Sequence, residues 1–259
     1  RHVDESSPRG IPGTLIRAQG LRHVPRVEHH HDYAPVFTKT SEDLIGHVPS
    51  MAGQPLRSGM RENHGCLRDI EDVVHRFRGR MGQVHLYDTT LRDGAQQEGI
   101  SLSVEDKLKI TQRLDALGVT FIEGGWPGAN PKEIEYFRKV RSLPLVNATI
   151  AAFGSTRRAN SSVEKDATLR AMLESEAPVI TLVGKSWDLH VHHILEASLE
   201  ENLAMIADSV ACVVADGRRA FFDAEHFFDG YKANPDYAIQ TVVAAAQAGA
   251  DCVVLCDTN

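Results

Sequence analysis

The chain has 259 residues, 42% of them hydrophobic, and a formal net charge of −7. That length fits one α/β barrel or two small domains with a buried core. Residues 81–259 carry sixteen Lys and Arg against twenty-five Asp and Glu, which excludes the basic face that nucleic-acid binding needs. No apolar run approaches the length of a membrane span, and four scattered cysteines do not form a disulfide framework. We therefore predict a soluble, cytoplasmic protein with reduced thiols.

Residues 1–80 differ from the rest in composition. They hold eight of the thirteen His and six of the eleven Pro, and no stretch before about Ile70 sustains a helical or strand period. We expect this segment to be disordered or non-native, with the run His29-His30-His31 in a solvated arm. It lacks the continuous apolar segment of a secretory signal. One hypothesis makes Met81 the natural start of the protein, which mass spectrometry of the native N-terminus would test.

From Met81 onward, short apolar runs alternate with helical patterns. The predicted strands are Val84–Tyr87, Val119–Ile122, Leu145–Phe153, Pro178–Val183, Ala220–Ala224 and Asp251–Cys256. Cys252 and Cys256 would lie about 13 Å apart along the last strand, so they are predicted to be buried rather than to share a metal.

Each helix between these strands is predicted from its capping residue and its apolar stripe. The predicted N-terminal caps are Ser103, Asn130 and Asn234, the last two followed by Pro, and the third helix starts near Ser161. The helix ends are placed at or near Gly118, Gly217 and Gly249. The stripes expected to face inward are Ile110, Leu114 and Leu117 in the first helix, Ile134 and Phe137 in the second, Leu169, Met172 and Leu173 in the third, and Leu203, Ile206, Val210 and Val213 in the fourth.

Strands that alternate with helices in this way favour a parallel sheet covered by helices. Periodicity alone does not choose between a doubly wound sheet and a barrel. No G-x-G-x-x-G sequence follows the first strand, which disfavours a dinucleotide-binding fold. Polar residues recur just after the strand ends, and convergence from many strands on one rim is the barrel pattern.

The stretch Leu86–Gln97 has the composition of a site at the end of a strand. It contains a hydroxyl pair, an Arg, two carboxylates and two amides. Asp93 can bind a hard divalent cation, and Arg92 presents a rigid fork of donors to a carboxylate or a developing alkoxide. The alternative interpretation is a capped turn with a surface ion pair.

From Asp88 the chain reads Asp-Thr-Thr-Leu-Arg-Asp-Gly-Ala-Gln. This sequence resembles the first strand of the metal-dependent acyl-CoA condensing and cleaving enzymes. The resemblance continues at Phe121–Gly128, Phe222–His226 and Cys256–Asn259, and it covers about residues 81–259. Within the 2-isopropylmalate and homocitrate synthase family, the chain is most similar to the citramalate synthase branch. The resemblance implies a TIM (β/α)8 barrel, which together with the rim of polar residues is our predicted fold.

The predicted barrel is truncated after its sixth strand, because eight strands are required to close it. The family's His-x-His pair of metal ligands on the seventh strand has no counterpart here. His190-Val191-His192 has the same spacing, but it follows the fourth strand and is disfavoured as a substitute. We expect this chain, purified alone, to be inactive, to bind Mg²⁺ or Mn²⁺ weakly, and to aggregate through its uncovered first and sixth strands.

The resemblance also implies roles for individual residues. Asp93 is implied as a ligand of a divalent metal ion (Mg, Mn or Zn), and Arg92 and Glu225 as catalytic residues. Substrate binding is assigned to Arg92, Gln96, Glu123 and Thr258, with Thr258 on the keto-acid carboxylate.

Several of these roles have alternatives. Glu225 could pair with the Arg, help to activate the acetyl methyl group, or form only a salt bridge at the rim. Glu123 could orient the Arg or satisfy backbone donors. Arg157 and Arg158 could reach the phosphates of coenzyme A, although a solvated loop is the more common case. Trp126 is expected to shape the pocket wall.

The implied reaction is a Claisen-type condensation of acetyl-CoA, as co-substrate, with a 2-keto acid. Pyruvate is favoured, giving citramalate and free CoA, as in isoleucine and leucine biosynthesis, by an enzyme that is a homodimer when full length. The alternatives are a 2-isopropylmalate or homocitrate synthase, an acyl-CoA lyase of the same superfamily, and an inactive fragment. The choice of keto acid depends on pocket volume and is not readable from motifs.

Overall fold

The computed structural model describes residues 15–18 and 84–258 of the chain. The chain divides into two units, residues 1–20 with 69–259 and residues 21–68, and only the first contains described residues. The proposed start at Met81, the His29-His30-His31 run and Cys66 lie outside them.

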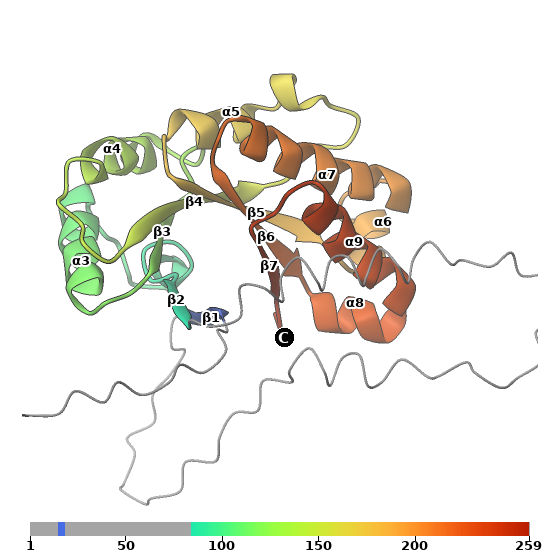
Figure 1. The fold of residues 1–259 in the computed structure, drawn as a ribbon, viewed down its shortest axis with the longest axis horizontal. Coiled ribbons are helices and arrows are strands. Elements are labelled where there is room, and N and C mark those ends of the chain that lie inside the picture. The colour runs from blue at the N-terminus through green and yellow to red at the C-terminus, as the bar shows by residue number, and fades with distance from the viewer. Residues whose placement is uncertain (1–14, 19–83, 259) are drawn as a thin grey trace, which may run out of the picture. The chain divides into compact units, whose positions relative to one another are not determined.

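A parallel sheet is the centre of the first unit. Its strands follow chain order and each pairs in parallel with the next. They are β1 (Leu15–Ala18), β2 (His85–Asp88), β3 (Phe121–Gly125), β4 (Thr149–Ser155), β5 (Val179–Lys185), β6 (Arg219–Glu225) and β7 (Cys252–Leu255). The sheet curls into a half-barrel (Figure 1), so the barrel-type α/β architecture predicted from the sequence is confirmed over these strands.

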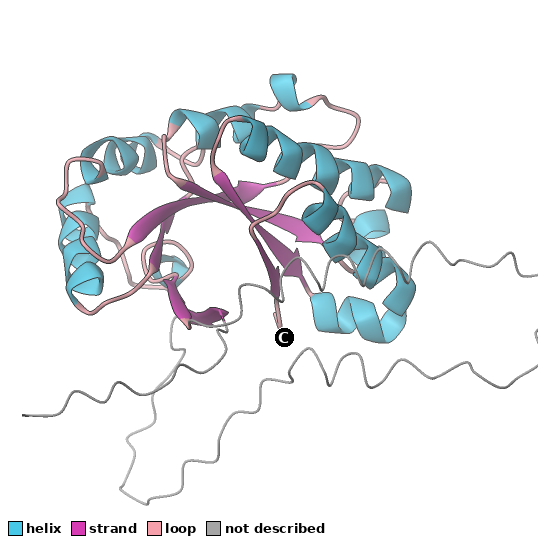
Figure 2. Ribbon diagram, viewed as in Figure 1, coloured by secondary structure: helices cyan, strands magenta, loops and turns pink. Residues whose placement is uncertain are grey.

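Helices cover the convex side of the curled sheet (Figure 2). They are α3 (Val104–Ala116), α4 (Pro131–Val140), α5 (Ala167–Glu174), α6 (Asp188–His193), α7 (Leu199–Ala215), α8 (Phe227–Ala233) and α9 (Pro235–Gln247), with the 3-10 turns η1 (Gly94–Gln96) and η2 (Val163–Lys165). The predicted caps are confirmed: the side chains of Ser103, Asn130 and Asn234 each accept the backbone N–H three residues further on. These bonds satisfy donors that a helix start leaves unpaired.

Side-chain alternation along the strands separates two faces of the sheet. On β3, Ile122 packs in a buried cluster with residues of α4, whereas Phe121 belongs to a different cluster with Tyr87 and Phe221. The Phe121 and Phe221 rings meet edge to face, 5.1 Å apart. This second cluster therefore fills the concave face, away from the helices. Because alternation continues, Glu123 on β3 also points to the concave face.

Two expectations about helix faces are wrong. Leu117 is 76% exposed and Ile134 is 59% exposed. In α4 the buried stripe runs through Glu133, Phe137 and Val140, and Ile134 lies about 100° away from Glu133 on the helix. Leu117 is the C-terminal cap of α3, one position beyond the helix.

The third strand and the third helix both begin later in the structure than predicted from the sequence. Residues 145–148 are not strand, because the carboxylate of Asp115 accepts the backbone N–H groups of Val146, Asn147 and Ala148 and holds them in a loop. Asp166, not a residue near Ser161, caps α5. The short helix α8 was not predicted.

A strand at Leu15–Ala18 also departs from the expectation of little structure before Ile70. This strand pairs with β2 over four residues, so β2 is not an edge of the described sheet. Four residues are too few to show a period in sequence. The pairing partner, which lies about 70 positions further along the chain, determines their conformation. The predicted boundary between residues 80 and 81 stays a prediction.

Candidate active site

The turn after β2 places Arg92 and Asp93 side by side. Asp88 accepts hydrogen bonds from the backbone N–H and the hydroxyl of Thr90, both at 3.0 Å. The carbonyl of Thr89 then accepts the N–H groups of Arg92 and Gly94. Such side-chain-to-backbone bonds are typical of Asx turns and fix the loop. Arg92 Nη1 lies 3.4 Å from Asp93 Oδ1, with Arg92 12% and Asp93 34% exposed in their side chains.

Arg92 is held from two further sides. Its Nε donates to Oε1 of Glu123 in an ion pair, and its guanidinium carbon lies 3.8 Å above the centre of the Phe153 ring. Glu123 is fully buried, so burial makes the ion pair strong and strongly directional. Of the alternatives left open, this geometry favours Glu123 as the residue that orients Arg92.

The end of β3 packs closely on two helices. A Cβ on Gly125 would lie 1.8 Å from Oε2 of Glu133, and a Cβ on Gly124 would lie 2.5 Å from the ring of Tyr136. Glu133 is paired with Lys107 at 2.6 Å, a contact buried between α3 and α4. The Glu-Gly-Gly sequence therefore lets α4 approach the strand directly behind Glu123.

Glu225 pairs with Lys185 and not with Arg92 as one interpretation expected. The two residues are opposite each other at the ends of β5 and β6, and Lys185 Nζ donates to Glu225 Oε2. Their side chains are 21% and 27% exposed. No role was predicted for Lys185 from the sequence, because the register that places it opposite Glu225 comes from the pairing of β5 with β6.

Thr258 lies beside the end of β6. Its hydroxyl accepts the backbone N–H of His226 at 3.2 Å, and Cys256 just before it bonds through its backbone to Ala224 and Phe227. The structure thus brings Thr258 close to Glu225 along the rim. Gln96 is exposed at the end of η1.

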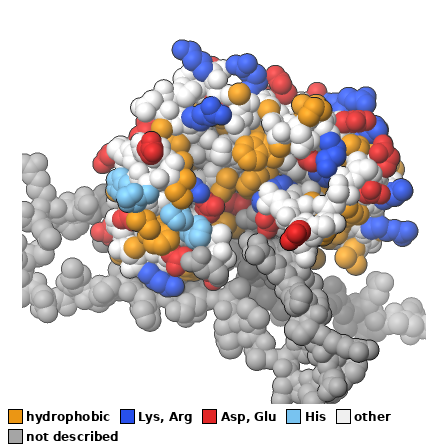
Figure 3. Space-filling model, turned by 180° about the vertical axis from the view of Figure 1, so that it is seen from behind, with side chains coloured by type: hydrophobic (Ala, Val, Ile, Leu, Met, Phe, Trp, Pro, Cys, Tyr) orange, Lys and Arg blue, Asp and Glu red, His pale blue; other side chains and the backbone are white. Residues whose placement is uncertain are grey.

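Two histidines and a tryptophan form a small cluster next to this rim. The His190 ring lies 4.7 Å from both the Trp187 ring and the His226 ring. Figure 3 shows histidine side chains gathered beside hydrophobic ones on one face of the molecule. Burial, followed by the nearby His226 and Lys185, lowers the pKa of His190. The His190 side chain is therefore neutral at pH 7.

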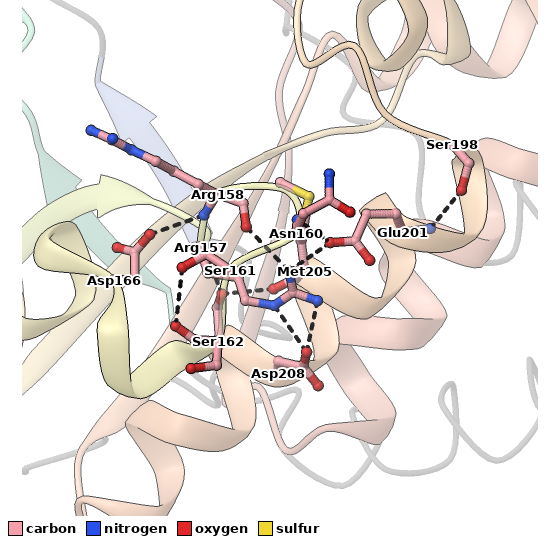
Figure 4. Close-up of polar contacts among 11 residues, drawn as sticks. Arg157, Arg158, Asn160, Ser161, Ser162, Asp166, Ser198, Glu201, Met205 and Asp208 are labelled. Atoms are coloured by element: carbon pink, nitrogen blue, oxygen red, sulfur yellow. Dashed lines mark hydrogen bonds and ion pairs between the residues drawn. The ribbon is translucent and has the colours of Figure 1, made fainter.

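Arg157 is neither solvated nor available for a phosphate. It is 5% exposed and forms ion pairs of 2.7 Å with Glu201 and 2.8 Å with Asp208, both on α7. Figure 4 shows its guanidinium between these carboxylates, while the side chain of Arg158 points away from the cluster. Arg158 is exposed. The predicted alternatives therefore apply to Arg158 alone.

Trp126 is 37% exposed and lies edge-on to Phe153, with 6.4 Å between ring centres. It therefore continues the row of Arg92 and Phe153 along the rim.

A metal at this rim would find Asp93 as one ligand. Within residues 84–258, no three His, Cys, Asp or Glu side chains come together in a group that could hold a metal ion. Asp93 is partly exposed and faces the rim beside Arg92, and a carboxylate is a fitting ligand for a hard divalent cation. The described residues therefore fit such an ion with one protein ligand.

In the same part of the chain, no helix is both long and apolar enough to cross a bilayer.

The curled parallel sheet, its covering helices and the polar rim define a (β/α)-barrel type of protein. The model of the HMGL-like family matches residues 83–259, and the chain belongs to that family.

Among curated proteins, the chain is 56% identical over 179 residues to the (R)-citramalate synthase of Geobacter sulfurreducens, covering 69% of this chain and 34% of that protein. It is 59% identical over 174 residues to the (R)-citramalate synthase of a Synechocystis species, covering 67% and 32%. A probable 2-isopropylmalate synthase of Methanopyrus kandleri is 33% identical over 68% of this chain and 33% of its own length. The chain thus spans about a third of the length of these relatives.

Among solved structures, hydroxymethylglutaryl-CoA lyase from Pseudomonas aeruginosa matches with a TM-score of 0.52 and 22% identity, over 67% of this chain and 57% of that one. This similarity concerns the fold.

Proposed function

We propose that the protein containing this chain condenses acetyl-CoA with a 2-keto acid and releases free CoA. The observation that carries the proposal is the rim built by Arg92, Asp93 and Glu123 at the carboxyl ends of β2 and β3, where barrel enzymes have their active sites. The identity of 51–59% to proteins named (R)-citramalate synthase supports it.

Arg92 is the residue that stabilises developing negative charge in this proposal. Its Nε donates to Glu123 and its Nη1 to Asp93, and the N–H groups of Nη2 are proposed to bind a carboxylate or an alkoxide oxygen. A preorganised donor of this kind contributes roughly 3–4 kcal/mol to transition-state stabilisation. Because Glu123 and Phe153 already hold the guanidinium, little reorganisation is needed at the moment of reaction.

Asp93 is proposed to contribute one carboxylate oxygen to a divalent metal ion. When bound, such an ion polarises the ketone of the substrate as a Lewis acid. Gln96 is proposed to donate to the substrate from the end of η1, and Thr258 to bind the keto-acid carboxylate through its hydroxyl.

Glu225 is proposed to help activate the acetyl methyl group. Its carboxylate lies at the carboxyl end of β6, in an ion pair with Lys185. Arg158, exposed on the loop after β4, is the remaining candidate for the phosphates of coenzyme A.

Pyruvate is the favoured keto acid, with citramalate as product and a place in isoleucine and leucine biosynthesis. The complete protein is proposed to be a cytoplasmic homodimer.

A thiol-release assay tests the proposal on the complete gene product. Acetyl-CoA with Mg²⁺ or Mn²⁺ is incubated with pyruvate, 2-oxoisovalerate or 2-oxoglutarate, and free CoA is followed with a thiol reagent. Release that depends on one keto acid is expected. Cleavage of a hydroxyacyl-CoA without any condensation would instead assign a lyase.

A further inference from the structure

A chain of three hydrogen bonds runs across the concave face of the sheet and ends at Arg92. Tyr87 Oη lies 2.7 Å from Oε2 of Glu123 and 2.7 Å from Oγ1 of Thr181. The other carboxylate oxygen of Glu123 accepts from Arg92. Three strands, β2, β3 and β5, thus contribute side chains to one connected set.

The direction of these bonds follows from counting protons. An ionised carboxylate only accepts hydrogen bonds, so the Tyr87 hydroxyl uses its single O–H group to donate to Glu123. The Thr181 hydroxyl must therefore donate to Tyr87. Burial, followed by the charges of Glu123 and Asp223, raises the pKa of Tyr87 well above its ordinary value. Tyr87 therefore keeps its proton and remains a donor.

The set is closed to water. Tyr87 is 3%, Thr181 1% and Glu123 0% exposed. Without Tyr87, Oε2 of Glu123 would lose a donor in a site where water does not replace it. The carboxylate would then be held less firmly about its terminal torsion, which has a broad energy minimum. Arg92 would follow, because its Nε is bonded to the same carboxylate.

We propose that Tyr87 is a positioning residue that fixes the carboxylate of Glu123, and through it the guanidinium of Arg92, with Thr181 acting through Tyr87. This inference rests on the proposed function, because it assigns to Tyr87 the geometry of the charge-stabilising Arg92. Tyr87 itself is buried and is assigned no contact with the substrate.

The test compares four forms of the complete gene product: wild type, Tyr87→Phe, Thr181→Val and the double variant. Tyr87→Phe should lower kcat by about 10- to 100-fold, with KM for the keto acid within about threefold of wild type. Thr181→Val should lower kcat less, because the bond from Tyr87 to Glu123 remains. The double variant should be no slower than Tyr87→Phe, since Thr181 has no effect once Tyr87 has lost its hydroxyl.

Tyr136→Phe is the matched control. Its hydroxyl is also buried and lies 2.9 Å from Thr111, but on the helix side of the sheet. It should lower the Tm while leaving kcat unchanged. If Tyr87→Phe alone is too unstable, the double variant still provides the measurement, because it also removes the Thr181 hydroxyl that would be left without its acceptor.

Two results would overturn the inference: a kcat of Tyr87→Phe equal to that of Tyr136→Phe, or losses from Tyr87 and Thr181 that simply multiply. The outcomes separate the two proposals. A wild-type enzyme without keto-acid-dependent CoA release contradicts both, whereas an active wild type matched by Tyr87→Phe contradicts only the role of Tyr87.

Discussion

Arg92 is the residue on which the proposed chemistry depends most. Arg92→Lys in the complete gene product should lower kcat by roughly 100-fold or more, because an ammonium cannot bond to Glu123 and present a planar pair of donors to the rim at the same time. Circular dichroism and the Tm should change little. Arg138→Lys, an exposed Arg on α4, is the control that should leave kcat as it is. Near-normal turnover of Arg92→Lys would remove Arg92 from the mechanism.

Asp93 makes a separate prediction, about metal affinity. Asp93→Asn should weaken binding of Mg²⁺ or Mn²⁺ in calorimetry and abolish condensation, because a neutral amide is a poorer ligand for a hard cation. The Tm of the metal-free protein should hardly move, since the side chain is 34% exposed and its contact with Arg92 is 3.4 Å long. Asp236→Asn, exposed on α9, should leave metal affinity unchanged. An Asp93→Asn protein that binds the metal with wild-type affinity would contradict the assignment of Asp93 as a metal ligand.

Arg92 and Asp93 could be predicted as site residues from the sequence because they are neighbours in one motif. Tyr87 could not be, since its partners Glu123 and Thr181 are 36 and 94 positions away. Arg157 was considered as a phosphate ligand, since nothing local indicates that two carboxylates of α7 surround it. Contacts between distant strands and helices decide such cases, and one sequence does not contain them in readable form.

At the scale of elements, Asp115 connects α3 to the loop before β4. Burial raises the pKa of Asp115, but the backbone N–H groups of Ala148, Asn147 and Val146 outweigh burial and bring the pKa below its ordinary value. Since the folded pKa is depressed, the stabilisation is present above the unfolded pKa of about 3.9 and is lost as pH falls below it.

Asp115→Ala should therefore lower the free energy of unfolding by about 2–4 kcal/mol at pH 7, measured by urea unfolding. The difference from wild type should shrink as the pH falls toward about 3. Asp115→Asn keeps the shape and one acceptor oxygen, so it should lose less. A constant difference between wild type and Asp115→Ala across this pH range would contradict the assigned role of the carboxylate.

The same residue explains why the third strand was predicted too long. The N–H groups of Val146, Asn147 and Ala148 bond to Asp115 instead of to a neighbouring strand. Helix caps were more predictable, because Ser103 and Asn130 act on residues only three positions away. Elements specified by local bonds were thus found, and boundaries specified by distant residues were not.

At the scale of the molecule, the order of elements was enough to predict a parallel sheet covered by helices, whereas the choice of a barrel also needed the polar rim and the family resemblance. Short apolar strands alternating with capped helices permit parallel pairing in chain order, and right-handed crossovers then place the helices on one side. The strand β1 was missed, because its four residues carry no period of their own and gain their conformation from β2. The curl of the sheet brings the polar ends of β2, β3, β5 and β6 to one rim (Figure 1).

The measurement that tests the central claim most directly is the identity of the product. The complete gene product is incubated with acetyl-CoA labelled with ¹³C in both acetyl carbons, with pyruvate and Mn²⁺, and the products are analysed by mass spectrometry and NMR. A condensation predicts a hydroxy diacid that carries both labelled carbons joined to the former ketone carbon, formed in equal amount with free CoA. Labelled acetate as the only product would mean simple thioester hydrolysis and would contradict the account.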